Sequence, residues 1–421
     1  MIKCGLCEEK VRDNNYIILK GNKKLCFNCV QSIVDVSEAM GSLNSFSLDE
    51  ISFVESKVDK NNMHSNVITR KPKEIKEFLD ERVIGQEKAK RILSVATYNH
   101  YKRMLMPEQG IQKSNILLVG PTGSGKTFLV QNLAEALDVP LTIVDATDFT
   151  EAGYIGEDVQ CMVTKLYERA GGDITKTEHG IIFIDEIDKL NKNSSETKSI
   201  VGGKGVQQAL LAMLEGMKIS VPVNSTDAKG VGQKVEIDTK NILFICGGAF
   251  PDMEESIKKR LNKNTSSIGF GADNLRAENK EETDILLHTN KDDLKEFGMI
   301  PELLGRLPIL APLEHLSKET LKRILTEPKN SIVKQFSKLF DFDSVKLVFD
   351  DDALDVIAEK ALAKKTGARS LRDLLEELLL DVQFEIPSNM EVGEVRITRG
   401  FVEGTDDVLY IKREKLKFAS V

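Results

Sequence analysis

The sequence lacks a surplus of positive charge. Lysine and arginine number 58 and aspartate and glutamate 66, so the formal net charge at pH 7 is −8. Such a chain has no global positive field to attract nucleic acid or an anionic membrane, although a local basic patch can still form. It also lacks any apolar run approaching the ~20 residues that span a bilayer, and its first residues, MIKCGLCEEK, lack the apolar stretch of a secretion signal. We therefore expect a cytoplasmic protein that partners with neither nucleic acid nor membrane.

Histidine and cysteine are also scarce. The five histidines are scattered and are assigned to no metal site, whereas four of the six cysteines form two close pairs, Cys4 with Cys7 and Cys26 with Cys29. Because the cytoplasm keeps thiols reduced, the pairs indicate metal binding rather than disulfides. Two such turns can supply four thiolates to a closed structural Zn²⁺ site, which would stabilise a segment too short to fold on its own core. A redox pair is the alternative, but two pairs at ribbon-like spacing favour zinc.

Composition divides the chain into four parts. Residues 1–35 hold both cysteine pairs, and residues 36–70 are polar and rich in Asn, Ser and Lys, which is typical of a flexible linker. Residues 71–313 combine helical patterns with short apolar runs, and residues 314–421 are mainly helical before two short strands. Because 41% of the residues are hydrophobic, the chain can fill sizeable cores. We expect a zinc-binding domain, a linker, a large domain and a smaller domain.

The large domain has the pattern of an α/β fold. From residue 72, apolar residues recur every three or four positions, which predicts amphipathic helices with a break at Gly85. Four short apolar runs separated by helical stretches predict parallel strands buried on both faces, at 115–120, 141–146, 180–186 and 241–248. In the smaller domain, helices followed by strands at 394–398 and 408–413 predict an α+β fold.

The segment GPTGSGKT fits the pattern G-x-x-x-x-G-K-[ST] between a predicted strand and a predicted helix. Glycines let backbone N–H groups close around phosphate oxygens, and the helix N-terminus adds partial positive charge. Lys126 would contact the β- and γ-phosphates, and Thr127 a Mg²⁺ ion. A glycine-rich turn without function is disfavoured because Lys and Thr both stand in register. We expect ATP to bind Gly120, Pro121, Thr122, Gly123, Ser124, Gly125, Lys126 and Thr127.

The run IIFIDEID supplies two carboxylates at the end of another buried strand. Asp185 would hold Mg²⁺, and Glu186 would polarise the attacking water. Alone, these acids could simply be a solvated strand end. Because a phosphate-binding loop lies upstream in the same predicted sheet, they favour nucleotide hydrolysis over nucleotide storage.

Two arginines stand out for electrostatic reasons. Arg369 precedes a predicted helix that Ser370 and Asp373 could open as a capping box. A cation is disfavoured at that end of a helix, and a bound anion would offset the repulsion. Arg306 lies beside a glycine and close to a proline, at a predicted turn between the two domains. The alternative for each is an ordinary surface arginine.

Together these motifs resemble those of the ClpX family, AAA+ protein unfoldases that feed the ClpP peptidase. The resemblance runs from Cys4 to about Ser388 and includes, in the family's order, both cysteine pairs, VIGQEKAK, GPTGSGKT, GYIGED, FIDEIDK, GVQQALLAMLEG, ILFICGGAF, IGFGA, GRLP and KTGARSLR. It implies an AAA+ P-loop ATPase that is not itself a peptidase and that works as a homo-hexameric ring. By resemblance, Val83 and Ile84 lie near the adenine, Arg306 reaches a neighbouring subunit's nucleotide, and Arg369 contacts its own.

The resemblance also explains two loops that carry apolar residues among polar ones. Flanking glycines would let the loop of Gly153, Tyr154, Ile155 and Gly156 move, and its apolar pair would grip an unfolded polypeptide in the axial pore. A loop tucked against the core is the alternative. The segment of Ile268, Gly269 and Phe270 would dock into clefts on ClpP, since exposed apolar residues on a loop usually indicate a partner.

The sequence departs from the family where its members usually carry a basic cluster at the pore entrance. Only Lys229 and Lys234 are cations within VPVNSTDAKGVGQKVEID, so the entrance should attract a carboxylate-ended degradation tag less strongly. The substrates are unfolded or tagged proteins whose identity stays open, and the zinc domain could recruit adaptors. The alternatives are a nucleic-acid remodelling ATPase, a partner of another peptidase as in the HslU family, and a ClpX-type chaperone acting without proteolysis. The acidic net charge disfavours the nucleic-acid remodelling ATPase. The cysteine pairs and the IGF loop disfavour a partner of another peptidase.

We predict that Tyr154→Ala leaves ATP hydrolysis largely intact and abolishes protein translocation, because the substitution removes the aromatic contact with the polypeptide and leaves the nucleotide motifs untouched. ATP turnover and degradation of a tagged test protein by ClpP measure the two activities separately. An equal loss of both would contradict the pore-grip role.

Overall fold

The computed structural model describes residues 2–3, 7, 10–11, 16–19, 23–26, 70–149, 158–190, 203–222, 234–265, 284–364 and 366–413. The chain divides into two units, Met1–Asn66 and Val67–Val421. The described part of the first unit contains two antiparallel pairs, β1 (Ile2–Lys3) with β2 (Lys10–Val11) and β3 (Tyr16–Leu19) with β4 (Lys23–Cys26). None of the described helices is long and apolar enough to cross a lipid bilayer.

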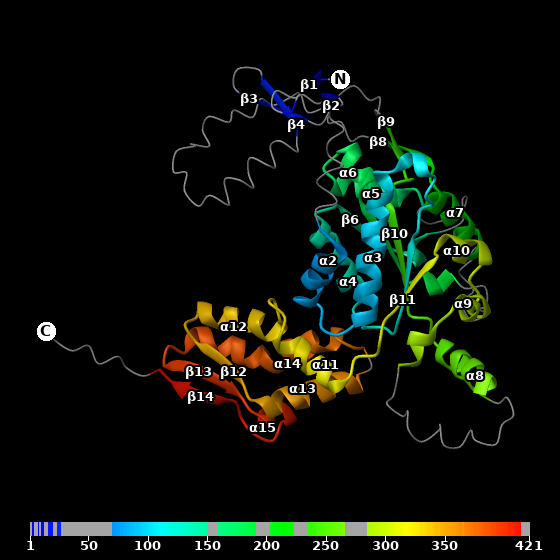
Figure 1. Cartoon of the computed structure of the whole chain (residues 1–421). Helices are drawn as coiled ribbons and strands as arrows, with labels where there is room; N and C mark the ends of the chain where they lie inside the picture. Colours follow the sequence, from blue (N-terminus) through cyan, green and yellow to red (C-terminus); the bar gives the residue numbers. More distant parts are fainter. Residues whose placement is uncertain are drawn as a thin grey trace. The chain divides into compact units, whose positions relative to one another are not determined.

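A five-stranded parallel sheet forms the centre of the second unit, in the order β11-β5-β10-β7-β6. Its strands are β5 (Ile116–Val119), β6 (Leu141–Asp145), β7 (Ile181–Asp185), β10 (Leu243–Gly248) and β11 (Ile309–Pro312) (Figure 1). The first four confirm the strands predicted from the apolar runs. Because all strands are parallel, their carboxyl ends share one edge of the sheet, where a ligand site is expected.

Strand β11 was not predicted. The sequence suggested only a turn between domains near residue 306, but the chain first returns to the sheet and pairs with β5. The run ILAP is short and ends in Pro312, which lacks a backbone N–H. Such a strand is tolerated because β11 lies at the edge of the sheet, where one row of backbone groups needs no strand partner.

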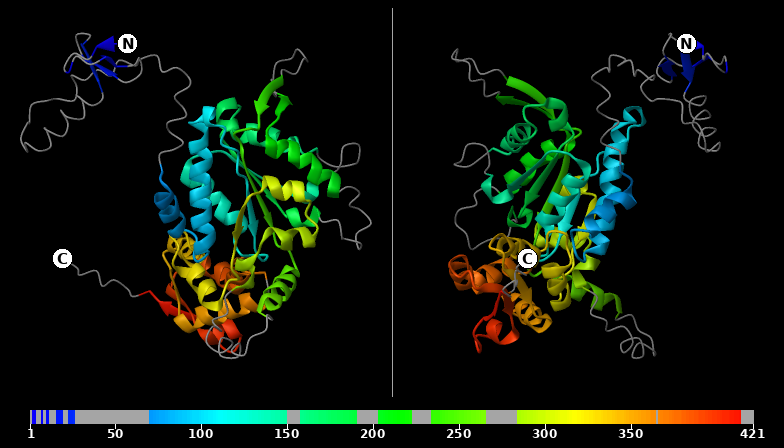
Figure 2. Two further views of the ribbon diagram at one scale, coloured as in Figure 1. Left: turned by 45° about the vertical axis from the view of Figure 1, so that its right-hand side comes forward. Right: turned by 90° about the vertical axis from the view of Figure 1, so that its left-hand side faces the viewer.

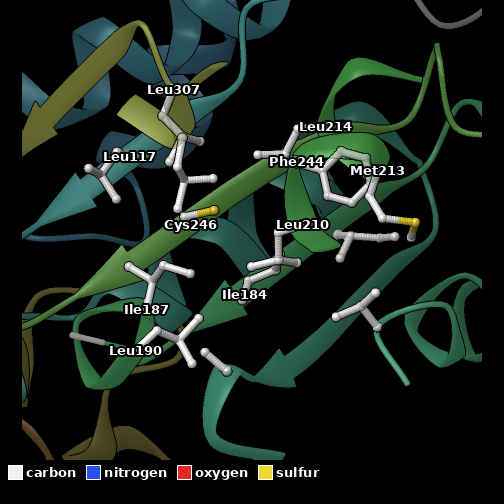
Figure 3. Close-up of a cluster of buried hydrophobic side chains, with 14 of the residues drawn as sticks. Leu117, Ile184, Ile187, Leu190, Leu210, Met213, Leu214, Phe244, Cys246 and Leu307 are labelled. Atoms are coloured by element: carbon white, nitrogen blue, oxygen red, sulfur yellow. The ribbon is translucent and has the colours of Figure 1, made fainter. Parts of the chain in front are cut away.

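Helices cover both faces of this sheet, and alternate strand residues point into two separate cores. On one face, Ile116, Phe183 and Ile245 pack with α2 (Pro72–Asp80), α3 (Glu87–Met104) and α4 (Lys126–Leu137). On the other, shown in Figure 3, Leu117, Ile184 and Phe244 pack with α5 (Cys161–Arg169), α7 (Gly203–Glu215) and α10 (Pro301–Arg306). The predicted break between the first two helices is confirmed at Gly85, which has a φ of 71°.

Shorter elements complete this part. The hairpin of β8 (Lys218–Pro222) and β9 (Lys234–Asp238) extends beyond the end of the sheet (Figure 2). The remaining helices are α6 (Ile174–Glu178), α8 (Met253–Thr265) and α9 (Lys291–Phe297). The described residues of this part also form the single-turn 3-10 helices η3 (Pro107–Gln109), η4 (Ala146–Asp148), η5 (Ile187–Leu190) and η6 (Ile285–His288).

The residues after β11 build a smaller core of their own, around Leu321, Phe336, Ile357 and Leu375. The predicted helices are present as α11 (Lys318–Thr326), α12 (Ile332–Phe342), α13 (Asp351–Ala363) and α14 (Arg369–Glu385). They pack with a sheet in which β13 (Val392–Ile397) pairs with β14 (Leu409–Lys412) and with β12 (Lys346–Phe349), a strand that the sequence did not reveal. Two short helices, η7 (Ile386–Ser388) and α15 (Arg399–Glu403), complete it.

A buried lysine fixes the turn between α2 and α3. Lys90 is 1% exposed, and its Nζ lies 2.6 Å from Asp80 Oδ1, 2.8 Å from Glu87 Oε1 and 3.1 Å from the carbonyl oxygen of Val83. Lys76 binds the second oxygen of each carboxylate at 2.7 Å. Burial raises the pKa of both carboxyls, but hydrogen bonds from the two lysines outweigh it and hold each pKa below its ordinary value. The network therefore holds the segment of Val83 in place.

We predict that Lys90→Met lowers the free energy of unfolding by about 1–2 kcal/mol at pH 7, because a carbonyl and two partly exposed carboxylates lose their buried cation while Lys76 still pairs with both carboxylates. Urea denaturation followed by circular dichroism measures the change, with Lys73→Met on the exposed side of α2 as the control. The pKa values of the carboxyls are lowered, so the stabilisation is present above their ordinary values of 3.8 and 4.5 and is lost on acidification below them. A difference as large at pH 2.5 as at pH 7 would argue against the ionic origin.

Candidate functional site

The predicted phosphate-binding loop joins β5 to α4 at the carboxyl edge of the sheet. Gly123 and Gly125 have φ values of 76° and 94°, a backbone conformation that favours glycine. A Cβ on Gly123 would overlap the carbonyl oxygen of Thr366, and the N–H of Ala368 donates to the carbonyl oxygen of Gly123 at 3.1 Å. The loop is therefore in direct backbone contact with the segment that precedes α14.

A hollow of about 460 Å³ lies against this loop. The structure brings most of the predicted catalytic residues together around it, although they come from distant parts of the sequence. Lys126 and Thr127 come from the start of α4, Asp185 and Glu186 from the end of β7, and Arg369 from the start of α14. Basic groups and carboxylates thus face one space, as binding of a metal-bound phosphate requires.

Lys126 is buried, and its Nζ donates to the carbonyl oxygens of Gly120 at 2.7 Å and Pro121 at 3.1 Å. Burial lowers the pKa of Lys126 below 10.5, and the charges of Asp185 and Asp188 oppose that shift. The ammonium is therefore held inside the loop by neutral carbonyls, for which an anionic phosphate would compete.

Thr127 and Asp185 are hydrogen-bonded, with Oγ1 donating to Oδ2 at 2.8 Å. The second carboxylate oxygen, Oδ1, accepts the backbone N–H of Glu186 at 2.9 Å. Hydroxyl and carboxylate oxygens are ligands that suit Mg²⁺. The chemistry of this pair fits the metal that the sequence predicts between them.

Glu186 has two features of a functional carboxylate. Its φ is 56°, a left-handed conformation that costs on the order of 1–2 kcal/mol for a residue with a side chain. Burial, and then the nearby charge of Asp145, raise the pKa of Glu186 above 4.5. Backbone strain and perturbed pKa values are both common at active sites. A raised pKa also makes a carboxylate a stronger base.

Asp188 was not identified from the sequence as a site residue. It lines the same hollow, and its carboxylate accepts the backbone N–H groups of Ala249 and Phe250 at 3.2 and 3.3 Å. It thereby ties the segment after β7 to the end of β10. The only available signal was its place three residues after Asp185 in FIDEID.

The predicted adenine contacts lie in a second hollow of about 220 Å³, which shares Gly125 and Phe128 with the first. Val83 and Ile84 line one side. The other side is formed by apolar residues of the smaller core that the sequence analysis missed, namely Leu316, Ile324, Pro328 and Ile332. Such a wall suits a purine base, but nothing in the sequence of α11, α12 and the residues beside them distinguished these positions from ordinary apolar ones.

The predicted capping box before α14 is wrong. The helix begins at Arg369, and no side chain caps its N-terminus. Ser370 lies inside the first turn, where its hydroxyl donates to the carbonyl oxygens of Gly367 at 2.7 Å and Ala361 at 3.3 Å. The end of the helix therefore faces the phosphate hollow with Arg369 beside it.

Arg306 does not line either hollow. It is the last residue of α10, so the turn that follows it lies inside the large domain and not between the two domains as predicted. Its guanidinium is half-exposed and lies 2.7 Å from the carboxylate of Glu215, while its carbonyl oxygen accepts from Asn115 at 3.0 Å. The side chain is therefore paired with the end of α7 and takes no part in either hollow.

Other predicted site residues lie wholly or partly outside the described residues. Cys7 is exposed and Cys26 ends β4, and the described residues contain no group of three or more His, Cys, Asp or Glu arranged to hold a metal. The four-cysteine site is therefore untested. The residues outside the description are Cys4, Cys29, Gly153, Tyr154, Ile155, Gly156, Ile268, Gly269 and Phe270.

Comparison with known proteins agrees with this geometry. Residues 111–310 match the family described as AAA domain (Cdc48 subfamily), and residues 316–397 match the C-terminal, D2-small domain of ClpB protein. The ATP-dependent Clp protease ATP-binding subunit ClpX of Treponema denticola is 50% identical over 348 residues, covering 81% of this chain and 83% of that protein. The chain belongs to the ClpX family. ClpX of Bacteroides thetaiotaomicron is 42% identical over 415 residues, covering 95% of each chain.

Membership in the ClpX family makes this chain an ATPase and not a peptidase. It confirms the resemblance inferred from the motifs and the AAA+ fold with its parallel sheet. An ATP-binding AAA domain also implies ATP with Mg²⁺, for which Thr127 and Asp185 supply suitable oxygens.

We predict that Glu186→Gln keeps ATP binding and reduces hydrolysis at least about 100-fold, the usual loss on removal of a general base. Gln retains the shape and removes the basic carboxylate. ATP affinity and turnover are measured on the same preparation, with Glu168→Gln on the exposed side of α5 as the control. Turnover within threefold of the unsubstituted protein would exclude Glu186 as the base.

Proposed function

We propose that this chain is an ATP-driven unfoldase and translocase that passes polypeptides to the ClpP peptidase. The observation that carries the proposal is that two parts of the chain build the nucleotide site. The phosphate loop touches the segment before α14, and Leu316 and Ile332 face Val83 across the adenine hollow. Hydrolysis there would change the angle between the large and small domains and pull a polypeptide held by the Tyr154 loop.

Each polar residue has a role in this proposal. Lys126 contacts the β- and γ-phosphates, Thr127 and Asp185 hold Mg²⁺, and Glu186 polarises the attacking water. Arg369 contacts the nucleotide of its own subunit, which is supported by its place on the phosphate hollow. These roles require no movement of the sheet, because Lys126, Thr127, Asp185 and Glu186 follow the carboxyl ends of its strands and line one hollow.

We further propose a homo-hexamer. The guanidinium of Arg306 lines neither hollow of its own chain and is half-exposed, which supports a contact with the nucleotide of a neighbouring copy. Phe342 at the end of α12 and Phe384 near the end of α14 are 91% and 85% exposed, and the two helix ends border one hollow. Exposed aromatic rings favour a partner, and a second copy of this chain suits a ring.

The four cysteines remain the proposed Zn²⁺ ligands. Each described antiparallel pair of strands carries one of them: Cys7 lies between β1 and β2, and Cys26 ends β4. Two hairpins that each carry one cysteine pair, Cys4 with Cys7 and Cys26 with Cys29, would supply the four thiolates of a closed Zn²⁺ site. The zinc would supply the stability of this small unit, and the unit would recruit adaptors.

The partners follow from the loops that lie outside the described residues. Ile268, Gly269 and Phe270 dock on ClpP, and the weakly basic pore entrance selects polypeptides with less dependence on a terminal carboxylate. A cytoplasmic location suits this work. The second candidate function is a chaperone that remodels complexes without ClpP, and the same ATP-driven site would power it.

We predict that a ClpP chamber without its catalytic serine captures polypeptides when incubated with this protein and ATP. Capture should vanish with Glu186→Gln, because movement of the polypeptide requires ATP hydrolysis. Capture should fall at least tenfold with Phe270→Ala, which removes an apolar contact worth about 1.5–3 kcal/mol. Mass spectrometry of the chamber contents identifies the captured proteins. An empty chamber with intact ATP turnover would reject the ClpP partnership and favour the chaperone.

A further inference from the structure

Gln86 adopts an unusual backbone conformation between the adenine hollow and α3. Its φ and ψ are 58° and 36°, in the left-handed region that residues with a side chain seldom occupy. Gly85 immediately before it also has a positive φ, of 71°. Two successive left-handed residues reverse the chain between Ile84, which lines the adenine hollow, and the first turn of α3. The conformation persists only where other interactions hold it.

The side-chain amide of Gln86 supplies those interactions. It is 3% exposed, and its Oε1 accepts the backbone N–H of Glu314 at 2.8 Å while its Nε2 donates to the carbonyl oxygen of Glu314 at 2.9 Å. The same Nε2 lies 3.4 Å from the carbonyl oxygen of Ser124. One amide therefore joins three segments: the turn beside the adenine hollow, the phosphate loop at Ser124, and Glu314, which lies just after β11.

Glu314 lies in the linker between the two domains. The sheet ends at Pro312, and the first helix of the smaller core begins at Lys318. The start of that helix also reaches the same turn, since a Cβ on Gly85 would lie 3.6 Å from Thr320 Cγ2. The paired hydrogen bonds of Gln86 are therefore made where the linker leaves the large domain.

Only a side chain with both a donor and an acceptor can make this pair of bonds. A glutamate at position 86 could accept from the N–H of Glu314 but could not donate to its carbonyl oxygen, and an asparagine would be one methylene too short. Methionine has the length of glutamine and lacks the amide. The two hydrogen bonds to Glu314 therefore require an amide at position 86, and a side chain of similar length without an amide cannot make them.

We propose that Gln86 is a positioning residue that couples the nucleotide site to the linker between the two domains. A nucleotide that shifts the turn of Ile84 or the phosphate loop at Ser124 moves the linker through the amide of Gln86. The coupling rests on the proposed function, in which movement between the domains performs the work. Gln86 touches neither phosphate nor metal in this scheme, so the chemistry of hydrolysis does not require it.

Hydrogen exchange of residues 313–317 tests the coupling without any unfolding assay. In the unsubstituted full-length protein, exchange in this peptide should differ between the nucleotide-free state and the state saturated with a slowly hydrolysed ATP analogue. In Gln86→Met, the N–H of Glu314 loses its acceptor, so its exchange should rise roughly tenfold and should no longer respond to the analogue. Gln86→Glu, which keeps only the acceptor, should also lose the response.

Gln207 provides a matched control. It is 1% exposed and also bonds two backbone groups, the carbonyl oxygen of Leu190 at 2.7 Å and the N–H of Ile300 at 2.9 Å, but both belong to the large domain. Gln207→Met should therefore leave the exchange of residues 313–317 and its nucleotide response unchanged. If both variants lose the response equally, general loosening is the cause and the proposal is wrong.

A second readout is the number of ATP molecules hydrolysed per substrate molecule captured in inactive ClpP. We expect this number to rise at least tenfold in Gln86→Met while ATP turnover stays within threefold. A linker that keeps its nucleotide response in Gln86→Met and Gln86→Glu overturns the inference. Failure of the unsubstituted protein to capture any polypeptide, with the exchange result as expected, would instead reject the proposed function and leave the coupling intact.

Discussion

The contact on which the site depends is between two stretches of backbone, the phosphate loop at Gly123 and the residues that precede α14. The carbonyl oxygen of Gly123 accepts from Ala368, and no side chain fits between Gly123 and Thr366. Through this contact, Arg369 reaches the phosphate hollow and the apolar residues of α11 and α12 reach the adenine hollow. The phosphate loop and the smaller domain are therefore joined by backbone contact, with no flexible side chain between them.

The rest of the large domain keeps that loop in a fixed place. Because the strands of the sheet are parallel and buried on both faces, the ends of β5 and β7 bring Thr127 and Asp185 within 2.8 Å. On the adenine side, the ion pairs of Lys90 fix the segment of Val83. The phosphate side and the Val83 side of the nucleotide site are thus both held by the large domain, whereas the facing apolar wall lies beyond the linker.

The sequence predicted the strands and site residues that belong to short contiguous motifs. It missed residues that join the site only through contacts between distant parts of the chain. Buried runs such as ILLV and IIFID predicted β5 and β7 because parallel strands need no alternation. By contrast, β11 is only four residues long, and Gly305 and Pro308 just before it predicted a turn. Leu316 and Ile332 look like ordinary core positions, and the left-handed Gln86 gave no local sign of its bonds to Glu314. The capping box failed because α14 begins at Arg369, one residue before Ser370, whose hydroxyl donates to the carbonyl oxygens of Gly367 and Ala361.

The ion pair of Arg306 and Glu215 is weak enough to leave the guanidinium available to another anion. Both side chains are about half-exposed, and an exposed ion pair contributes about 0–1 kcal/mol. A hydrogen bond between a guanidinium and a phosphate is charge-assisted and can be bidentate, so it is considerably stronger. Glu215 therefore orients Arg306 in the isolated chain without holding it against a competing anion. The backbone below is more firmly fixed, because Asn115 binds the carbonyl oxygen of Arg306 from within the core, and this leaves the side chain as the part able to exchange partners.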